Sequence, residues 1–184
     1  MGKKLTVTQI KKELSKLPKE ELIDIICRLC KASKEDIDQV NLFLGNDSFV
    51  DEALEEAKKK VRNQFFTNRG FGRLNLTDAK SAISKFKKVY NDPVRVIELQ
   101  LYYVECGIEF TNTLGDISES FYNSMAGMYE TVVKSLIKTE DSQLIEKFMP
   151  RLKKALDDTE GIGWGFHDDL YDSFSKFRKK VSAK

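Results

Sequence analysis

The sequence has few of the residues that most often carry out catalysis, with one histidine and three cysteines in 184 residues. A di-iron carboxylate bundle needs Glu-x-x-His pairs on facing helices, so a single histidine excludes it. The Gly-x-Ser-x-Gly, Walker and His-Glu-x-x-His motifs are also absent from the sequence. The sequence therefore indicates no particular reaction and no cofactor.

Long apolar runs are lacking as well. No run approaches the roughly 20 residues that a membrane-spanning helix needs, and the first residues, MGKKLTVTQ, have no apolar stretch typical of a secretion signal. An odd number of cysteines without an export signal favours reduced thiols. We therefore expect a cytoplasmic protein that has no membrane partner.

A strong net charge is missing too, because 31 basic side chains face 29 acidic ones and leave a formal charge of +2. Such a balance argues against nucleic acid as the main partner. An alternative remains in residues 58–73, where Lys58, Lys59, Lys60 and Arg62 precede a loop with two arginines, two glycines and Phe71. Cations mixed with an aromatic residue could bind phosphate weakly.

The cysteines allow one metal hypothesis. Cys27 and Cys30 have the spacing of zinc ligands, and Cys106 with His167 would complete the set. However, the Cys-x-x-Cys pair falls inside a predicted helix, not on the turn that zinc sites usually occupy. We therefore predict small buried apolar residues at both positions and no metal site.

Helical periodicity is what the sequence has in abundance. No stretch alternates with period two over the length of a strand, so we predict an all-α protein. The helix pair in residues 76–110 is followed by another in 116–157, an offset of about 40 residues that is common in helical repeats. We predict an irregular, solenoid-like stack of helical hairpins, with a closed helical bundle as the alternative. Residues 1–184 are expected to form a single domain, with an N-terminal part in 1–45 and a main helical body in 46–184.

The stretch 92–110 is predicted to be the central helix. Asp92 can cap its start, and Pro93 suits the first helical position. Two apolar stripes follow on opposite sides: Val94, Ile97, Leu101, Val104 and Ile108 on one, and Val96, Leu99, Tyr103, Cys106 and Phe110 on the other. A helix with two apolar sides needs two partner layers, so this helix should lie in the middle of the core.

A narrow polar stripe separates the apolar sides of this helix. It consists of Arg95, Glu98, Tyr102, Glu105 and Glu109, and we call it the acidic stripe. On a helix that is otherwise buried, such a stripe is the first place to look for function. The alternative is an ordinary solvated face.

A second candidate is the segment GWGFHDDL, residues 163–170. Trp164 offers a flat apolar contact, and His167 with Asp168 falls at a predicted helix start. Histidine is the natural general base near neutral pH. If this segment covers the acidic stripe, Glu98, Tyr102, Glu105, Glu109 and His167 would line one polar cleft. Alternatively, Trp164 fills the core and His167 caps the helix.

Two local signals concern the C-terminal half. Asp116 with Glu119 predicts the start of a helix after the central one. Pro150 interrupts the apolar spacing of the following segment, where it is expected to kink or divide the helix.

The phrases IELQLYYVECGIEFTNTLGDISESFYNSM and GWGFHDDL, with the N-terminal KKELSKLPKEELIDIICRLCK, resemble a family of small, mostly bacterial proteins known as a domain of unknown function. The likeness covers most of the chain. It implies an all-helical, bacterial, cytoplasmic protein, and it brings no activity, cofactor or binding residue with it.

The function is therefore unknown at this point, and three hypotheses follow. The first is a non-enzymatic helical interaction or scaffold domain that binds another protein or its own copy. The second is an enzyme or small-ligand binder that uses the acidic stripe with Trp164, His167 and Asp168. The third is the nucleic-acid binder through residues 58–73.

Overall fold

The structure is a computed structural model that describes residues 4–139 and 141–182. The chain divides into two compact units, Met1–Ser48 and Phe49–Lys184. We call them the N-terminal unit and the main unit and describe each by itself. The division falls near the boundary predicted between the N-terminal part and the main body, and the single-domain organisation stays a prediction.

The N-terminal unit consists of α1 (Val7–Leu14), α2 (Lys19–Ala32) and α3 (Lys34–Phe43). Local signals explain where two of these helices begin. Thr6 and Gln9 form a capping box before α1. The hydroxyl oxygen of Ser33 accepts a hydrogen bond from the Asp36 N–H at 3.2 Å before α3.

The cysteines of α2 correct one expectation. Cys27 is exposed and Cys30 is partly exposed, so the prediction that both are buried was wrong. The reason is that α2 has no buried residue at all. Within the described residues, no group of three or more potential ligands is arranged to hold a metal ion.

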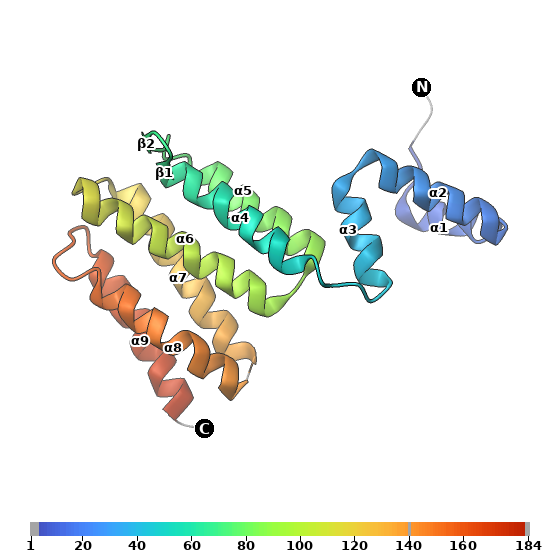
Figure 1. Cartoon of the computed structure of the whole chain (residues 1–184). Helices are drawn as coiled ribbons and strands as arrows, with labels where there is room; N and C mark the ends of the chain where they lie inside the picture. Colours follow the sequence, from blue (N-terminus) through green and yellow to red (C-terminus); the bar gives the residue numbers. More distant parts are fainter. Residues whose placement is uncertain (1–3, 140, 183–184) are drawn as a thin grey trace. The chain divides into compact units, whose positions relative to one another are not determined.

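The main unit is a stack of three helical hairpins that follow one another in space as in the sequence (Figure 1). These are α4 (Val50–Phe65) with α5 (Leu76–Tyr90), α6 (Pro93–Leu114) with α7 (Glu119–Thr139), and α8 (Ser142–Asp157) with α9 (Phe166–Ser182). The predicted loop between α4 and α5 contains a short antiparallel hairpin, β1 (Phe66–Thr67) with β2 (Gly70–Phe71), in which Phe66 pairs with Phe71. The all-α stack is confirmed. None of the helices described here is both long and apolar enough to cross a bilayer.

The central helix α6 begins where the sequence predicts. The Asp92 carboxylate accepts a hydrogen bond from the Arg95 N–H at 2.9 Å, and Pro93 is the first helical residue. Both apolar stripes are buried apart from Val94, which is 36% exposed. Helix α6 packs against α4, α5, α7 and α8, which supply the two partner layers. The prediction of a helix packed from both sides is therefore confirmed.

Two of three local expectations in the C-terminal half need correction. The helix after α6 begins at Glu119, because the Ser118 hydroxyl and not Asp116 accepts from a free N–H, that of Phe121 at 3.3 Å. Pro150 lies inside α8, so it does not divide the helix, and a kink at this position stays a prediction. Trp164 is 55% exposed, and Phe166, which is fully buried, fills the core instead.

Gly107 tests the close packing of α6 against α7. A Cβ atom at this position would lie 2.1 Å from the Met125 sulfur, which is fully buried. We expect Gly107→Ala to lower the free energy of unfolding, because overpacking costs about 1–3 kcal/mol and outweighs the gain of up to about 1 kcal/mol from helix propensity. Chemical denaturation followed by circular dichroism measures the change.

Gly127 on α7 is the matched control, because a Cβ atom there meets no other atom within 4 Å. Gly127→Ala should therefore stabilise the protein by up to about 1 kcal/mol. If both substitutions stabilise, α6 and α7 do not pack as closely as described.

Candidate functional site

The acidic stripe of α6 is lined by cations from the helices on either side. On one side, α4 contributes Lys58 and Arg62, and on the other α8 contributes Arg151. The stripe is therefore not a row of free carboxylates, and it is partly buried at Glu98 and Glu105, although Glu109 is exposed. It is the polar seam of a contact among three helices.

Arg151 has the most extensive contacts in this seam. Its guanidinium donates two hydrogen bonds to the two oxygens of Glu105, both at 2.8 Å, and a third to Glu98. Parallel hydrogen bonds of this kind are among the strongest polar contacts in proteins. The Arg151 and Glu105 side chains are about one-third exposed, and Glu98 is more buried.

Glu98 is shared between both neighbouring helices. Lys58 lies 3.0 Å from its other carboxylate oxygen, and the same ammonium sits over the Tyr102 ring at 5.5 Å from the centroid. Burial opposes ionisation of Glu98, but the hydrogen bonds from Lys58 and Arg151 outweigh burial and bring its pKa below the ordinary value. Glu98 is therefore ionised at neutral pH and is a poor general acid.

Glu109 forms a separate pair at the far end of the stripe. Its two oxygens accept hydrogen bonds from Arg62 at 2.8 and 2.9 Å, and these bonds lower its pKa. Between the two pairs lies Cys106, a thiol whose pKa burial raises to about 11. It is thus a weak nucleophile at neutral pH.

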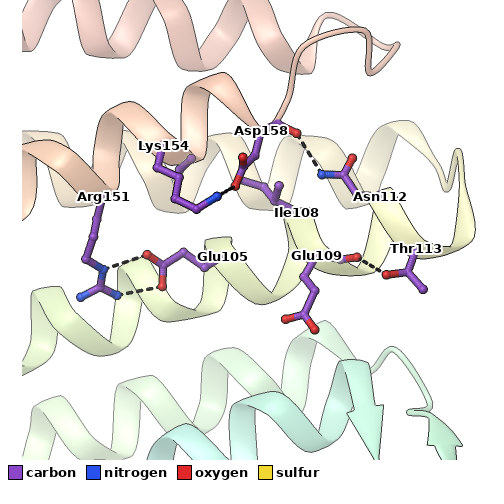
Figure 2. Close-up of a pocket in the computed structure, with 9 residues that line it drawn as sticks. Glu105, Ile108, Glu109, Asn112, Thr113, Arg151, Lys154 and Asp158 are labelled. Atoms are coloured by element: carbon purple, nitrogen blue, oxygen red, sulfur yellow. Dashed lines mark hydrogen bonds and ion pairs between the residues drawn. The ribbon is translucent and has the colours of Figure 1, made fainter.

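A cavity of about 480 Å³ opens beside the Arg151–Glu105 pair, between α6 and the end of α8 (Figure 2). Helix α6 lines it with Glu105, Ile108, Glu109, Asn112 and Thr113, and the end of α8 with Arg151, Lys154, Ala155 and Asp158. The Asn112 side chain donates to the Asp158 carbonyl at 2.9 Å, and Lys154 pairs with the Asp158 carboxylate at 2.6 Å. The charges around the cavity are therefore largely satisfied by one another.

Of the residues predicted for the site, Glu105 and Glu109 line this cavity, and Figure 2 shows that the Glu109 carboxylate points away from α8. Glu98 and Tyr102 lie on the same helix, but among the described residues they are not part of the lining. Ligand binding by the predicted set of residues stays a prediction.

The segment 163–170 makes its own contacts. The Trp164 indole donates to the Asp116 carboxylate at 2.7 Å, and the His167 Nδ1 atom lies 3.0 Å from the Thr159 hydroxyl. Asp168 is exposed in the first turn of α9, where a negative charge favours the helix. The lining of the cavity, as far as the chain is described, includes none of Trp164, His167 and Asp168.

Sequence reasoning missed the cations that complete the site. Arg151 is 46 residues from Glu105 in the sequence, so no local spacing connects the two. A weak signal exists, because Arg151 adjoins Leu152 and Lys58 adjoins Ala57, both buried. Long cations beside an apolar face often reach a neighbouring helix. The position of such a cation in the sequence does not show which glutamate it pairs with.

The ion pairs that Lys58 and Arg62 form with glutamates of α6 also bear on the nucleic-acid hypothesis. Both cations of this region that face α6 are already held by glutamates. Nucleic-acid binding through residues 58–73 stays a prediction, with fewer free cations than the sequence suggests.

The fold and the site define an all-α protein in which one central helix is joined to its neighbours by a seam of ion pairs. A family model matches residues 5–178, and the chain belongs to that family, a family of unknown function named DUF6155. No curated protein and no solved structure matches the chain. The resemblance noted from the sequence phrases, to a domain of unknown function, is confirmed.

The ion pairs predict that replacing Arg151 lowers the free energy of unfolding more than replacing Arg62. Arg151→Met keeps the apolar stem and leaves Glu98 and Glu105 without this partner, so we expect a loss on the order of 2 kcal/mol in the free energy of unfolding. Arg62→Met breaks a pair whose two side chains are 41% and 49% exposed, and it should cost below about 1 kcal/mol.

The cost of Arg151→Met should also depend on pH. Folding lowers the pKa of Glu98 below its ordinary value of 4.5. Ionised Glu98 therefore contributes its full share to the free energy of unfolding above pH 4.5, and this share is lost as the pH falls through the pKa of the folded state. Urea denaturation of the wild type and both variants across pH 7 to about 3 should show the gap between wild type and Arg151→Met narrowing. If the difference in the free energy of unfolding between wild type and Arg151→Met does not change with pH, or if both substitutions lower that free energy equally, these ion pairs do not stabilise the fold as described.

Proposed function

We propose that this protein is a non-enzymatic helical protein-interaction domain that binds through its N-terminal unit. One observation carries this proposal. Between Lys4 and Ser48, the described part of that unit, the only buried residue is Asp38. The large apolar side chains exposed there are Leu5, Val7, Ile10, Ile23, Ile26, Leu29, Ile37, Phe43 and Leu44.

The energetics of small helical units support an external partner. Helices α1 and α2 have 8 and 14 residues, and isolated helices of that length are marginal in water. Units below about 70 residues usually need a disulfide, a metal or an oligomeric contact. Cys27 and Cys30 are free thiols, so they supply no crosslink here. Burial against another chain would supply the missing stabilisation.

A second copy of the chain is the partner we propose. Ile23, Ile26, Cys27 and Cys30 follow the spacing of one side of α2, and Ile23 and Ile26 are 50% and 45% exposed. Two such apolar stripes can pack against each other around a twofold axis. Residues 1–48 carry nearly equal numbers of basic and acidic side chains, so charge does not oppose this association. The proposal includes a bacterial, cytoplasmic setting, which the family resemblance implies.

Ile26→Glu tests the interaction surface. We expect the wild type to reach twice the 21.1 kDa mass of one chain in light scattering after size exclusion over about 1–100 µM. A buried charge at the centre of the stripe should weaken the dimer at least tenfold. Circular dichroism checks that the variant keeps its helices.

Lys31→Gln is the matched control, because it changes the net charge by the same amount at another exposed position of α2. This variant should stay dimeric. A wild-type protein that is monomeric at every concentration contradicts the proposal, and so does a dimer that Ile26→Glu leaves intact.

A further inference from the structure

A smaller cavity of about 280 Å³ lies at the other end of α6, where α5 ends, α6 begins and α7 ends. Its apolar part is formed by Pro93, Val96 and Ile97, and its polar part by side chains of all three helices. The volume is at the small end of ligand sites in proteins. This cavity is separate from the ion-paired seam.

Gln100 is the feature that distinguishes this cavity. It lines the cavity, is only 7% exposed, and its Oε1 atom is buried without a hydrogen-bond partner among the residues that the structure describes. A buried carbonyl oxygen without a donor is costly and rare in native proteins. The oxygen and nitrogen of the amide exchange places when the side chain rotates. Such a rotation would let the oxygen accept from a ligand N–H or O–H group in the cavity, and the amide nitrogen would then take the buried position.

The hydroxyl groups of α7 point to the same ligand chemistry. Thr131 donates its hydroxyl hydrogen to the Gly127 carbonyl at 2.8 Å, and Ser135 donates to the Thr131 carbonyl at 2.9 Å. Both residues line the cavity. Because the hydrogens are already used, their oxygens can only accept further hydrogen bonds. The wall therefore favours a ligand that carries several donors.

Two lysines that line the cavity add a second requirement, a negative charge on the ligand. Lys87 from α5 and Lys138 from α7 both line the cavity and are exposed. Neither has an ion pair with any residue that the structure describes, unlike the cations of the seam. Ammonium groups at the mouth of a cavity favour a ligand that carries an anionic group.

We propose that this cavity binds a small anion that also carries hydroxyl groups, with the size and chemistry of a phosphorylated sugar or a sugar acid. The anionic group lies between Lys87 and Lys138, and the hydroxyl groups donate to Gln100, Thr131 and Ser135. This site is independent of the dimer contact proposed above.

Calorimetric titration of the full chain tests the site with four probes: glucose 6-phosphate, glucuronate, glucose and inorganic phosphate. We expect glucose 6-phosphate or glucuronate to bind at least tenfold more tightly than glucose or inorganic phosphate, because only the first two carry both an anion and hydroxyl groups. Which of the two binds more tightly identifies the anionic group as phosphate or carboxylate. Equal affinity for all four probes, or no binding of either sugar anion at about 1 mM, overturns the proposal.

Variants locate the binding. The double substitution Lys87→Gln/Lys138→Gln should weaken binding of the sugar anion at least tenfold. The control, Lys85→Gln/Lys88→Gln, changes the same charge at exposed positions of α5 outside the cavity lining, and it should leave affinity within about twofold. Equal losses in the two pairs would indicate general charge attraction and overturn the site.

Gln100→Leu separates a ligand role from a structural one. Without ligand, this variant should unfold at a temperature equal to or above that of the wild type, because an unsatisfied amide is replaced by an apolar group of similar size. With the sugar anion, the rise in unfolding temperature seen for the wild type should be lost. A variant that unfolds at lower temperature and still binds the anion would show that Gln100 serves only the fold.

Discussion

Helix α6 buries apolar side chains on two opposite sides, and the arrangement of the main unit depends on this burial. A helix of this kind must be enclosed by other helices, and here α4, α5, α7 and α8 enclose it. Its charged residues are confined to the narrow strip that remains. Because that strip is itself partly buried, its carboxylates need partners, and Lys58, Arg62 and Arg151 provide them.

The two ends of α6 meet this requirement differently. Near Asn112, the cavity is bordered by charges that pair with one another, such as Arg151 with Glu105 and Lys154 with Asp158. Near Gln100, a buried carbonyl oxygen has no hydrogen-bond donor within the described part of the chain, and two lysines that line the cavity have no described ion pair. A set of polar groups that is complete in itself stabilises the fold, whereas an incomplete one leaves room for a ligand. The unpaired polar groups of the smaller cavity therefore favour it as the ligand site.

In the described part of the N-terminal unit, apolar side chains are left without a packing partner in the same way. Helices α1 and α3 begin at side-chain caps, yet side chains such as Ile26 and Phe43 stay exposed. In the main unit, comparable side chains such as Ile97 and Phe121 are fully buried or nearly so. The proposed dimer contact would complete the N-terminal unit, and the proposed anion would complete the polar cavity of the main unit.

Most of the helical architecture could be predicted from the sequence, because it depends on local signals. Asp92 with Pro93 marked the start of α6, and the spacing of Val96, Leu99 and Tyr103 marked one of its buried sides. The candidate site was harder to predict, because its partners are distant in the sequence. No spacing relates Glu105 to Arg151, and no local pattern shows that the Gln100 oxygen has no donor among the residues described.

Side chains that can serve either of two roles account for the remaining errors. Trp164 and Phe166 are both large aromatics in one glycine-rich segment, and only the packing decides that Phe166 is buried. Cysteine is often buried in a core, but no apolar residue is buried in the described part of the N-terminal unit, Lys4 to Ser48, and Cys27 is exposed there. Asp116 lies two residues too early to cap α7 and instead accepts hydrogen bonds from Tyr122 and Trp164.

Native-state hydrogen exchange, followed residue by residue, tests the central role of α6 most directly. We predict that amides of α6 between Leu99 and Phe110 exchange only when the whole main unit unfolds, because both sides of the helix are buried. Their protection should equal the free energy of unfolding from denaturation. Exchange from α6 at a lower free energy than from α4 or α8 would contradict the account.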